Sequence, residues 1–322
     1  MYEDTVFFCW RIDMYKVGID LGATKVAGGV IDSNNELIEK ESIPTRHNCE
    51  PELIAADISR MVFRFAARLN VSMSAFDCIG IGIPGSVEND TVKDANNIGF
   101  YNVPFAEMVS ARTGLAVTLI NDANAAARGE YVAGSGKGAD SFFMLTIGTG
   151  IGGAYIYKGD IVKGCNLAAG EIGHMVIRVD GKQCSCGRKG CFEAYCSATA
   201  LSVRAREMAV TNKYSLLNKL TDNNLYKIDG KLFFRALEEG DRSCVDIFDQ
   251  YMRDLTTGVV NVINLLQPDV LAIGGGVSGV GSKLLDTLKE RVNREVYSLH
   301  SEKQTDIRIA TLGNDAGIIG AV

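Results

Sequence analysis

FFMLTIGTGIGGAYIYKG, residues 142–159, is the stretch that says most about the architecture of this chain. An apolar run leads into a glycine turn and a second apolar run follows, which predicts a strand, a tight turn and another strand. The stretch YKVGIDLGATKVAGGVID, residues 15–32, repeats this plan around Gly22. Two units of one design, far apart in the chain, predict two related lobes.

The segments around these units predict alternating helices and strands. Apolar residues recur at spacings of three and four over 54–69 and over 245–266, which predicts two amphipathic helices, and Pro268 prevents the second from continuing. Short apolar runs that end in turns predict buried strands at 78–85, 116–122 and 269–277. This alternation is typical of an α/β protein with mostly covered sheets.

The composition excludes several classes of protein. A net charge of −6 without a basic block argues against nucleic acid as a partner. The longest uncharged stretch, Ser141–Tyr157, is interrupted by glycines, and the start MYEDTVFFCW lacks a basic region, so we expect neither a membrane span nor a signal peptide. We therefore expect a cytoplasmic protein with reduced thiols. Residues 1–13 are expected to be a leader, a loose tail or a short edge strand.

Three glycine turns after predicted strands are candidates for phosphate binding: DLGATK at 20–25, IGTGIGG at 147–153 and IGGGV at 273–277. Glycine lets backbone N–H groups approach an anion closely, and Asp20 could hold Mg²⁺ through water. Each turn alone also fits a plain hairpin, and none matches a Walker A or Rossmann motif. The candidate nucleotide-binding residues are Asp20, Gly22, Ala23, Thr24, Lys25, Gly148, Thr149, Gly150, Gly152, Gly274, Gly275 and Gly276.

A cysteine cluster follows a rare histidine. The chain has three histidines and nine cysteines, and His174, Cys184, Cys186 and Cys191 form a Cys₃His set that suits tetrahedral Zn²⁺. Such a site would be structural, because four protein ligands leave no open position. The alternatives are buried thiols or a redox pair at Cys184 and Cys186. The other cysteines are scattered: Cys9, Cys49, Cys78, Cys165, Cys196 and Cys244.

Asp122 stands between the predicted strand at 116–122 and the helical segment ANAAARGEY. In this position a carboxylate can cap the helix. It can also act as a general base if a reacting hydroxyl lies beside it. Residue type and position alone favour the cap.

Taken together, these motifs resemble the ROK family of bacterial sugar kinases and repressors, within the actin–hexokinase–Hsp70 fold group. The resemblance extends from Met14 to Val322, and its combination of a histidine with Cys-x-Cys-x₄-Cys is very specific. The motifs that carry it are DLGATK at 20–25, GIGIPG at 80–85, ND at 121–122, IGTGIGG at 147–153, AGEIGH at 169–174, CSCGRKGCFE at 184–193 and GGGV at 274–277.

The resemblance implies a two-lobe actin-like ATPase fold with ribonuclease H-like lobes, and ATP and sugar in the cleft. Residues 14–122 with about 311–322 would form the first lobe. Residues 123–310 would form the second, with a zinc-binding loop at 174–193.

The resemblance also implies roles for individual residues. Asp122 would be the general base that accepts the proton of the sugar 6-hydroxyl, and Asn121 would hold a neighbouring hydroxyl. Phe100 departs mildly from the family, in which many glucose-phosphorylating members have tryptophan nearby. The remaining implied sugar contacts are Gly85 at the back wall, Asn96 or Asn97, Glu171, His174 and Glu193.

The function that follows is an ATP-dependent hexose kinase, with glucose as first choice, ATP, Mg²⁺ and structural Zn²⁺ as cofactors, and a place in glycolysis. An N-acetylmannosamine or N-acetylglucosamine kinase is the alternative. A sugar-sensing repressor is disfavoured, since residues 1–13 are too few for a helix-turn-helix domain. The resemblance implies a homodimer without nucleic-acid or membrane partners. We expect zinc to organise the sugar contacts without a role in the phosphate loops.

Overall fold

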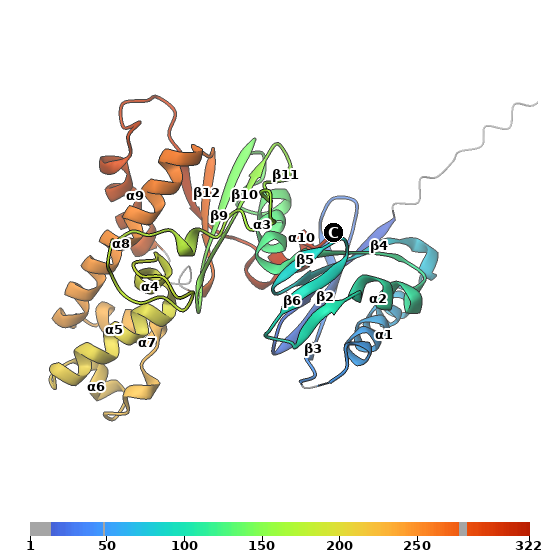
Figure 1. Cartoon of the computed structure of the whole chain (residues 1–322), viewed down its shortest axis with the longest axis horizontal. Coiled ribbons are helices and arrows are strands. Elements are labelled where there is room, and N and C mark those ends of the chain that lie inside the picture. Colours follow the sequence, from blue (N-terminus) through green and yellow to red (C-terminus); the bar gives the residue numbers. More distant parts are fainter. Residues whose placement is uncertain (1–13, 48, 277–281) are drawn as a thin grey trace, which may run out of the picture. The chain divides into compact units, whose positions relative to one another are not determined.

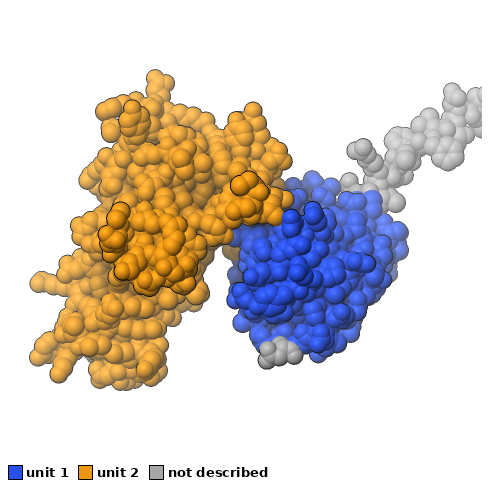
Figure 2. Space-filling model, viewed as in Figure 1, with its two compact units in different colours: residues 1–129, 314–322 blue, residues 130–313 orange. Residues whose placement is uncertain are grey.

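The structure is a computed structural model, and it describes residues 14–47, 49–276 and 282–322 of the 322-residue chain. The expected tail at 1–13, which includes Cys9, and Val277 of the third glycine turn lie outside the described residues. The chain divides into two compact units (Figure 2). Met1–Gly129 and Asn314–Val322 belong to unit 1, and Glu130–Gly313 forms unit 2.

Unit 1 is built on a five-stranded sheet of order β3-β2-β1-β4-β8 (Figure 1). Its strands are β1 (Tyr15–Leu21), β2 (Lys25–Ile31), β3 (Leu37–Pro44), β4 (Phe76–Ile83) and β8 (Ala116–Asn121). The first three form an antiparallel meander, whereas β4 and β8 run parallel to β1. The carboxyl ends of β1, β4 and β8 therefore lie at one edge, where the residues that follow these strands come together.

Helix α1 (Pro51–Leu69) forms as the spacing of its apolar residues predicts. Pro51 stands at its start, where the missing N–H costs nothing, and Asn70 ends it in the left-handed conformation. Its buried side chains share a core with Val17 and Ile19 of β1. Helix α2 (Phe105–Thr113) packs beside α1. A small second sheet contains β5 (Ser86–Glu88), β6 (Thr91–Ala95) and β7 (Phe100–Val103).

Glycines bring the C-terminal helix α10 (Ala316–Gly320) into backbone contact with the sheet. Side chains alternate between the faces of a strand, so Gly18 and Gly80 stand on the face opposite to their large apolar neighbours. A Cβ on Gly18 would lie 1.9 Å from the Ile318 carbonyl oxygen, and one on Gly80 would lie 1.9 Å from that of Ala321. The alternation of isoleucine and glycine in GIGIPG is therefore a packing requirement.

Unit 2 repeats the topology of unit 1. Its sheet has the order β11-β10-β9-β12-β13, with β9, β10 and β11 antiparallel and with β12 and β13 parallel to β9. This correspondence confirms the two related lobes. The strands are β9 (Ser141–Ile147), β10 (Ile151–Tyr157), β11 (Asp160–Ile161), β12 (Val270–Gly274) and β13 (Asp306–Ile309).

The longest helix of unit 2, α8 (Arg242–Leu266), confirms the second predicted helix, although Val245 of the predicted apolar stripe is 48% exposed. Gln267 ends it in the left-handed conformation immediately before Pro268. Among the helices of the described residues, none combines the length and apolar character that a membrane span requires. The other helices are α4 (Glu193–Cys196), α5 (Ala198–Thr211), α6 (Leu216–Leu220), α7 (Gly230–Glu238) and α9 (Ser282–Glu295).

The first division between the units falls after Gly129, whereas we expected it after Asp122, and the second falls after Gly313, close to the expected position about 310. The first turns of helix α3 (Asp122–Ala133) belong with unit 1 because glycines join them to α10. A Cβ on Gly129 would lie 2.1 Å from the Ala316 carbonyl oxygen, so the two backbones touch.

Gly18→Ala should destabilise the protein, because its Cβ would meet the Ile318 carbonyl oxygen at 1.9 Å. Relief requires α10 to move off the sheet, and overpacking of this kind costs about 1–3 kcal/mol. Urea unfolding would measure the loss against Gly230→Ala, in which the new Cβ meets nothing within 4 Å. Equal stability of the two variants would contradict the close packing of α10.

Candidate functional site

Two aspartates lie at the carboxyl edge of the unit 1 sheet. Asp20 is in β1, in register with Gly82 of β4, and Asp122 directly follows β8. The pKa of Asp20 is raised to about 6, chiefly by burial and then by the charge of Asp122, while Lys25 opposes the rise. Burial also raises the pKa of Asp122. Carboxylates that are costly to ionise together suit a divalent cation or a proton acceptor.

Asn121, not Asp122, is the N-cap of α3. Its Oδ1 accepts from the N–H groups of Ala123 at 3.0 Å and Asn124 at 3.2 Å. Its Nδ2 donates to the Gly85 carbonyl oxygen at 3.0 Å and to Asp122 Oδ1 at 3.2 Å. Asn121 therefore takes the N-cap position that residue type and position alone favoured for Asp122, and it also orients the Asp122 carboxylate. Asp122 Oδ1 shares the Ala123 N–H with it, at 2.8 Å.

The other predicted residues of unit 1 surround this edge. Gly85 has φ +90°, and a Cβ there would lie 1.9 Å from the Asp94 carbonyl oxygen. Asn96 and Asn97 are exposed in the turn between β6 and β7, where Asn96 Oδ1 accepts from Tyr101. Phe100 is a core residue, fully buried against Phe105 with ring centroids 5.1 Å apart.

The first glycine turn, residues 20–25, joins β1 to β2. The Gly22 N–H donates to the Lys25 carbonyl oxygen at 3.0 Å, and the Thr45 hydroxyl donates to the Gly22 carbonyl oxygen at 2.7 Å. Gly22 and Ala23 are half-buried, whereas Thr24 and Lys25 are exposed. The turn thus offers two exposed side chains on a fixed backbone.

The other two glycine turns lie side by side in unit 2. Gly148–Gly150 joins β9 to β10, and Gly274 of β12 pairs with Thr146 of β9. Gly275 has φ +85°, and a Cβ there would lie 2.4 Å from the Ile147 carbonyl oxygen. Only glycine allows this approach, so the two turns form one edge of the unit 2 sheet.

The predicted Cys₃His set comes together in unit 2. The ligand atoms of His174, Cys184, Cys186 and Cys191 lie within 4.8 Å of one another. The Cys186 and Cys191 sulfurs are 3.7 Å apart, and Cys184 Sγ is 3.8 Å from His174 Nδ1. A tetrahedron with Zn–S bonds of about 2.3 Å has S–S edges of roughly 3.8 Å, so the thiol pair fits a metal of this size.

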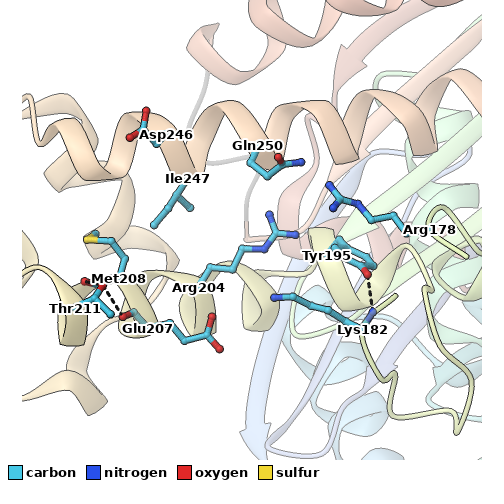
Figure 3. Close-up of a pocket in the computed structure, with 10 residues that line it drawn as sticks. All are labelled: Arg178, Lys182, Tyr195, Arg204, Glu207, Met208, Thr211, Asp246, Ile247 and Gln250. Atoms are coloured by element: carbon cyan, nitrogen blue, oxygen red, sulfur yellow. Dashed lines mark hydrogen bonds between the residues drawn. The ribbon is translucent and has the colours of Figure 1, made fainter. Parts of the chain in front are cut away.

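An ionic cluster at Asp254 docks the segment that carries these cysteines on the helices of unit 2. Figure 3 shows Arg178, Lys182, Tyr195 and Arg204 gathered at this place. Arg178 and Arg204 both bind Asp254, which is 3% exposed, and both stack on the Tyr195 ring. The Lys182 N–H donates to the Tyr195 hydroxyl at 2.6 Å. Arg178, Lys182, Tyr195 and Arg204 line a pocket of about 530 Å³, which contains no predicted site residue.

Glu193 connects the cysteine segment to the second glycine turn. Its Oε2 accepts from the Ile151 N–H at 2.9 Å, and a Cβ on Gly150 would lie 2.4 Å from this oxygen. Its Oε1 lies 3.3 Å from Ser185 Oγ and 3.9 Å from Cys184 Sγ. The cysteine segment and the second glycine turn, which are separate in the sequence, are therefore joined by a hydrogen bond, while the expectation that zinc has no role in the phosphate loops stays a prediction.

Glu171 is the remaining predicted residue of unit 2. It precedes the short 3₁₀ helix Ile172–His174 and is exposed, with its carbonyl oxygen accepting from the His174 N–H at 3.1 Å. Sequence reasoning missed Ser185 and the Ile151 amide as partners of Glu193. The serine within CSCG was a visible signal, but a backbone amide gives none.

Comparison with known proteins gives a consistent set of relatives. A model of the ROK family matches residues 16–322. The chain is 36% identical over 312 residues to a glucokinase of Halalkalibacterium halodurans, which covers 96% of this chain and 94% of that protein. A ROK family glucokinase from Streptomyces griseus, solved in complex with glucose and AMPPNP, has a TM-score of 0.77 at 33% identity, over 95% of this chain and 97% of its own. A ROK hexokinase from Thermus thermophilus has a TM-score of 0.81 at 31% identity, over 96% of each chain.

Asp20→Asn should make the protein more stable at neutral pH, because the amide removes the cost of ionising a buried carboxylate. A pKa of about 6 in place of 3.8 means that the folded state loses on the order of 3 kcal/mol as pH rises through this window. The advantage of the variant should be small near pH 4 (about the ordinary pKa of Asp) and should grow until about pH 7.

Urea unfolding at several pH values would measure this difference in the absence of divalent cations. Asp77→Asn, at an exposed aspartate of the same unit, is the matched control. An advantage that stays constant with pH would show that ionisation of Asp20 is not its source.

Proposed function

The chain belongs to the ROK family, and from this membership we propose that it is an ATP-dependent glucokinase that phosphorylates the 6-hydroxyl of glucose. Its fold is the two-lobe actin-like ATPase fold that the sequence predicted. The observation that carries the proposal is Asp122, whose carboxyl has a raised pKa and which Asn121 orients at the edge of the sheet shared with Asp20.

Asp122 acts in this proposal as the general base. Its raised pKa makes the carboxylate a better proton acceptor, so it takes the proton of the 6-hydroxyl as the oxygen attacks the γ-phosphorus of ATP. The P–O bond to ADP breaks, and Asp122 then returns its proton to solvent. Both side-chain N–H groups of Asn121 and its Oδ1 already form hydrogen bonds within the chain. We therefore assign Asn121 to positioning Asp122 rather than to holding a sugar hydroxyl.

The nucleotide contacts are assigned to the three glycine turns. Thr24 and Lys25 of the first turn are exposed, and the backbones of Gly148–Gly150 and Gly274–Gly276 lie at one edge of unit 2. Asp20 would hold Mg²⁺ through water, because hard cations prefer carboxylate oxygen. The ion would also remove the penalty that raises the pKa of Asp20.

The sugar contacts are assigned to Glu171, His174 and Glu193 in unit 2 and to Gly85 with Asn96 or Asn97 in unit 1. We propose that His174 Nδ1 and the three cysteines hold a structural Zn²⁺, since their spacing fits it. Metal on Nδ1 leaves the Nε2 proton to donate to a sugar hydroxyl. The metal fixes the segment that carries Glu193, which has little apolar core of its own.

We further propose a cytoplasmic location and a homodimer. The described cysteines are free thiols, which suits a reducing compartment. The dimer rests on family analogy, and light scattering of the purified protein would test it.

A coupled assay of ADP formation tests the proposed function directly. Glucose, mannose, allose and the N-acetylhexosamines would be compared at equal concentration, and we expect glucose to give the highest kcat/KM. Preference for N-acetylmannosamine or N-acetylglucosamine would replace glucose as the substrate. If the protein phosphorylated none of these sugars, the proposed function would be overturned.

Asp122→Asn should abolish phosphorylation while glucose still binds. The amide keeps the size and polarity of the carboxylate but cannot accept a proton, so kcat should fall by about 10²–10⁴-fold. Steady-state kinetics would measure kcat, and calorimetry would measure glucose affinity, with Asp77→Asn as the matched control. A near-normal kcat would leave Asp122 as no more than a structural or sugar-contacting residue.

Cys186→Ser should lose the bound metal, because a serine hydroxyl is a poor zinc ligand near neutral pH. Elemental analysis should find about one zinc per chain in the parent protein and in Cys165→Ser, which changes an exposed cysteine outside the cluster. The KM for glucose should rise by more than about 10-fold, the upper end for losing one aligned hydrogen bond, because His174 and Glu193 lose their support. The KM for ATP should rise less, because the cysteine segment contacts the second glycine turn through the hydrogen bond from the Ile151 N–H to Glu193. Full sugar affinity without zinc would contradict this organising role.

A further inference from the structure

The second glycine turn has a donor for each of its three carbonyl groups. The Gly148 oxygen accepts from the Ala198 N–H at 2.8 Å, and the Gly150 oxygen accepts from the Gly148 N–H at 2.9 Å. Between them, the Thr149 oxygen accepts from the Thr199 hydroxyl at 2.7 Å. Two of the three donors thus come from the first two residues of α5.

Two N–H groups of the same turn, unlike its carbonyl groups, have no hydrogen-bond partner among the described residues. Within residues 14–47, 49–276 and 282–322, the N–H groups of Thr149 and Gly150 donate to no other group. The next amide, of Ile151, donates to Glu193. The turn therefore keeps its carbonyl oxygens engaged and two donors available, which is the arrangement that an anion requires of a backbone loop.

Because a peptide group is planar, the bonded carbonyl oxygens of the turn also determine where its N–H groups point. The carbonyl of Thr149 and the N–H of Gly150 belong to the same planar peptide group and point in opposite directions. Holding the Thr149 carbonyl against α5 therefore directs the Gly150 N–H away from α5. The bond from Ala198 to the Gly148 carbonyl directs the Thr149 N–H in the same manner.

We propose that Thr199 is a positioning residue for the nucleotide phosphates, acting through the peptide group between Thr149 and Gly150. This inference rests on the proposed kinase function. Glycine on both sides of Thr149 makes rotation of this peptide group cheap, and a rotated peptide would present its carbonyl oxygen to the phosphates. The Thr199 hydroxyl opposes that rotation.

The hydroxyl of Thr199 has no competing structural role among the described residues. The N-cap of α5 is Ser197, whose side chain accepts from the Ala200 N–H at 3.1 Å. Thr199 itself is exposed and contributes no buried methyl group to the core. Loss of its hydroxyl should therefore affect the turn more than the stability of the helix.

Three variants test the proposal. Thr199→Val keeps the shape and removes the hydroxyl, Thr199→Ser keeps the hydroxyl, and Thr211→Val is the matched control at the other end of α5, where the hydroxyl donates to the Met208 carbonyl oxygen at 3.0 Å. We expect Thr199→Val to raise the KM for ATP by about 3- to 10-fold, the range for one lost hydrogen bond. The KM for glucose and kcat should stay within about twofold, the lower end of that range. Thr199→Ser and Thr211→Val should resemble the parent protein.

Calorimetry of ATP and of adenosine supplies a second readout that does not depend on turnover. Thr199→Val should weaken the binding of ATP and leave the affinity for adenosine unchanged, because adenosine lacks the phosphates. An unchanged affinity for ATP, or equal losses for ATP, adenosine and glucose, would overturn the proposal while the kinase function stood. A parent protein that binds ATP and phosphorylates no sugar would refute the kinase function, and the ATP-to-adenosine comparison would still decide the role of Thr199.

Discussion

The absence of side chains at Gly18 and Gly80 is the constraint on which unit 1 depends. Because these glycines share one face of the sheet, the backbone of α10 can lie directly on β1 and β4, and the chain end can close the unit. Gly317 of that helix then stands over Asp20, and a Cβ on this glycine would lie 3.1 Å from the carboxylate carbon. The packing that completes the unit is thus the packing that buries the aspartate and raises its pKa.

In unit 2, hydrogen bonds and ion pairs hold the cysteine segment and the second glycine turn together. The cysteine segment has little regular structure, so thiols, an ionic cluster at Asp254 and the bonds of Glu193 hold it in place. Through Glu193 and Thr199, the segment and the helix that follows it fix the glycine turn at Gly148–Gly150. Residues that would touch sugar and residues that would touch phosphate are therefore parts of one bonded network, and a change at the Cys₃His set would reach both.

The sequence predicted the features that repeat or cluster locally. Periodicity identified α1 and α8, the duplicated strand–turn–strand plan identified two related lobes, and spacing identified the Cys₃His set. It could not show that Asn121 rather than Asp122 caps α3, because both residue types are good caps. The partners of the glycine turn, separated from it by 42 and 50 residues, were equally beyond reach since only the tertiary fold brings them together.

Two features of the proposed site lower the stability of the folded protein. An ionised Asp20 is unfavourable in this position, and the glycines on both sides of Thr149 lose more backbone freedom on folding than other residues would lose there. Both costs are reduced by the ligands that the site is proposed to bind, since a cation neutralises the carboxylate and a phosphate engages the free amides. Ligands that bind only the folded state stabilise it. The same groups that make the empty protein less stable therefore link its stability to occupancy by nucleotide and metal.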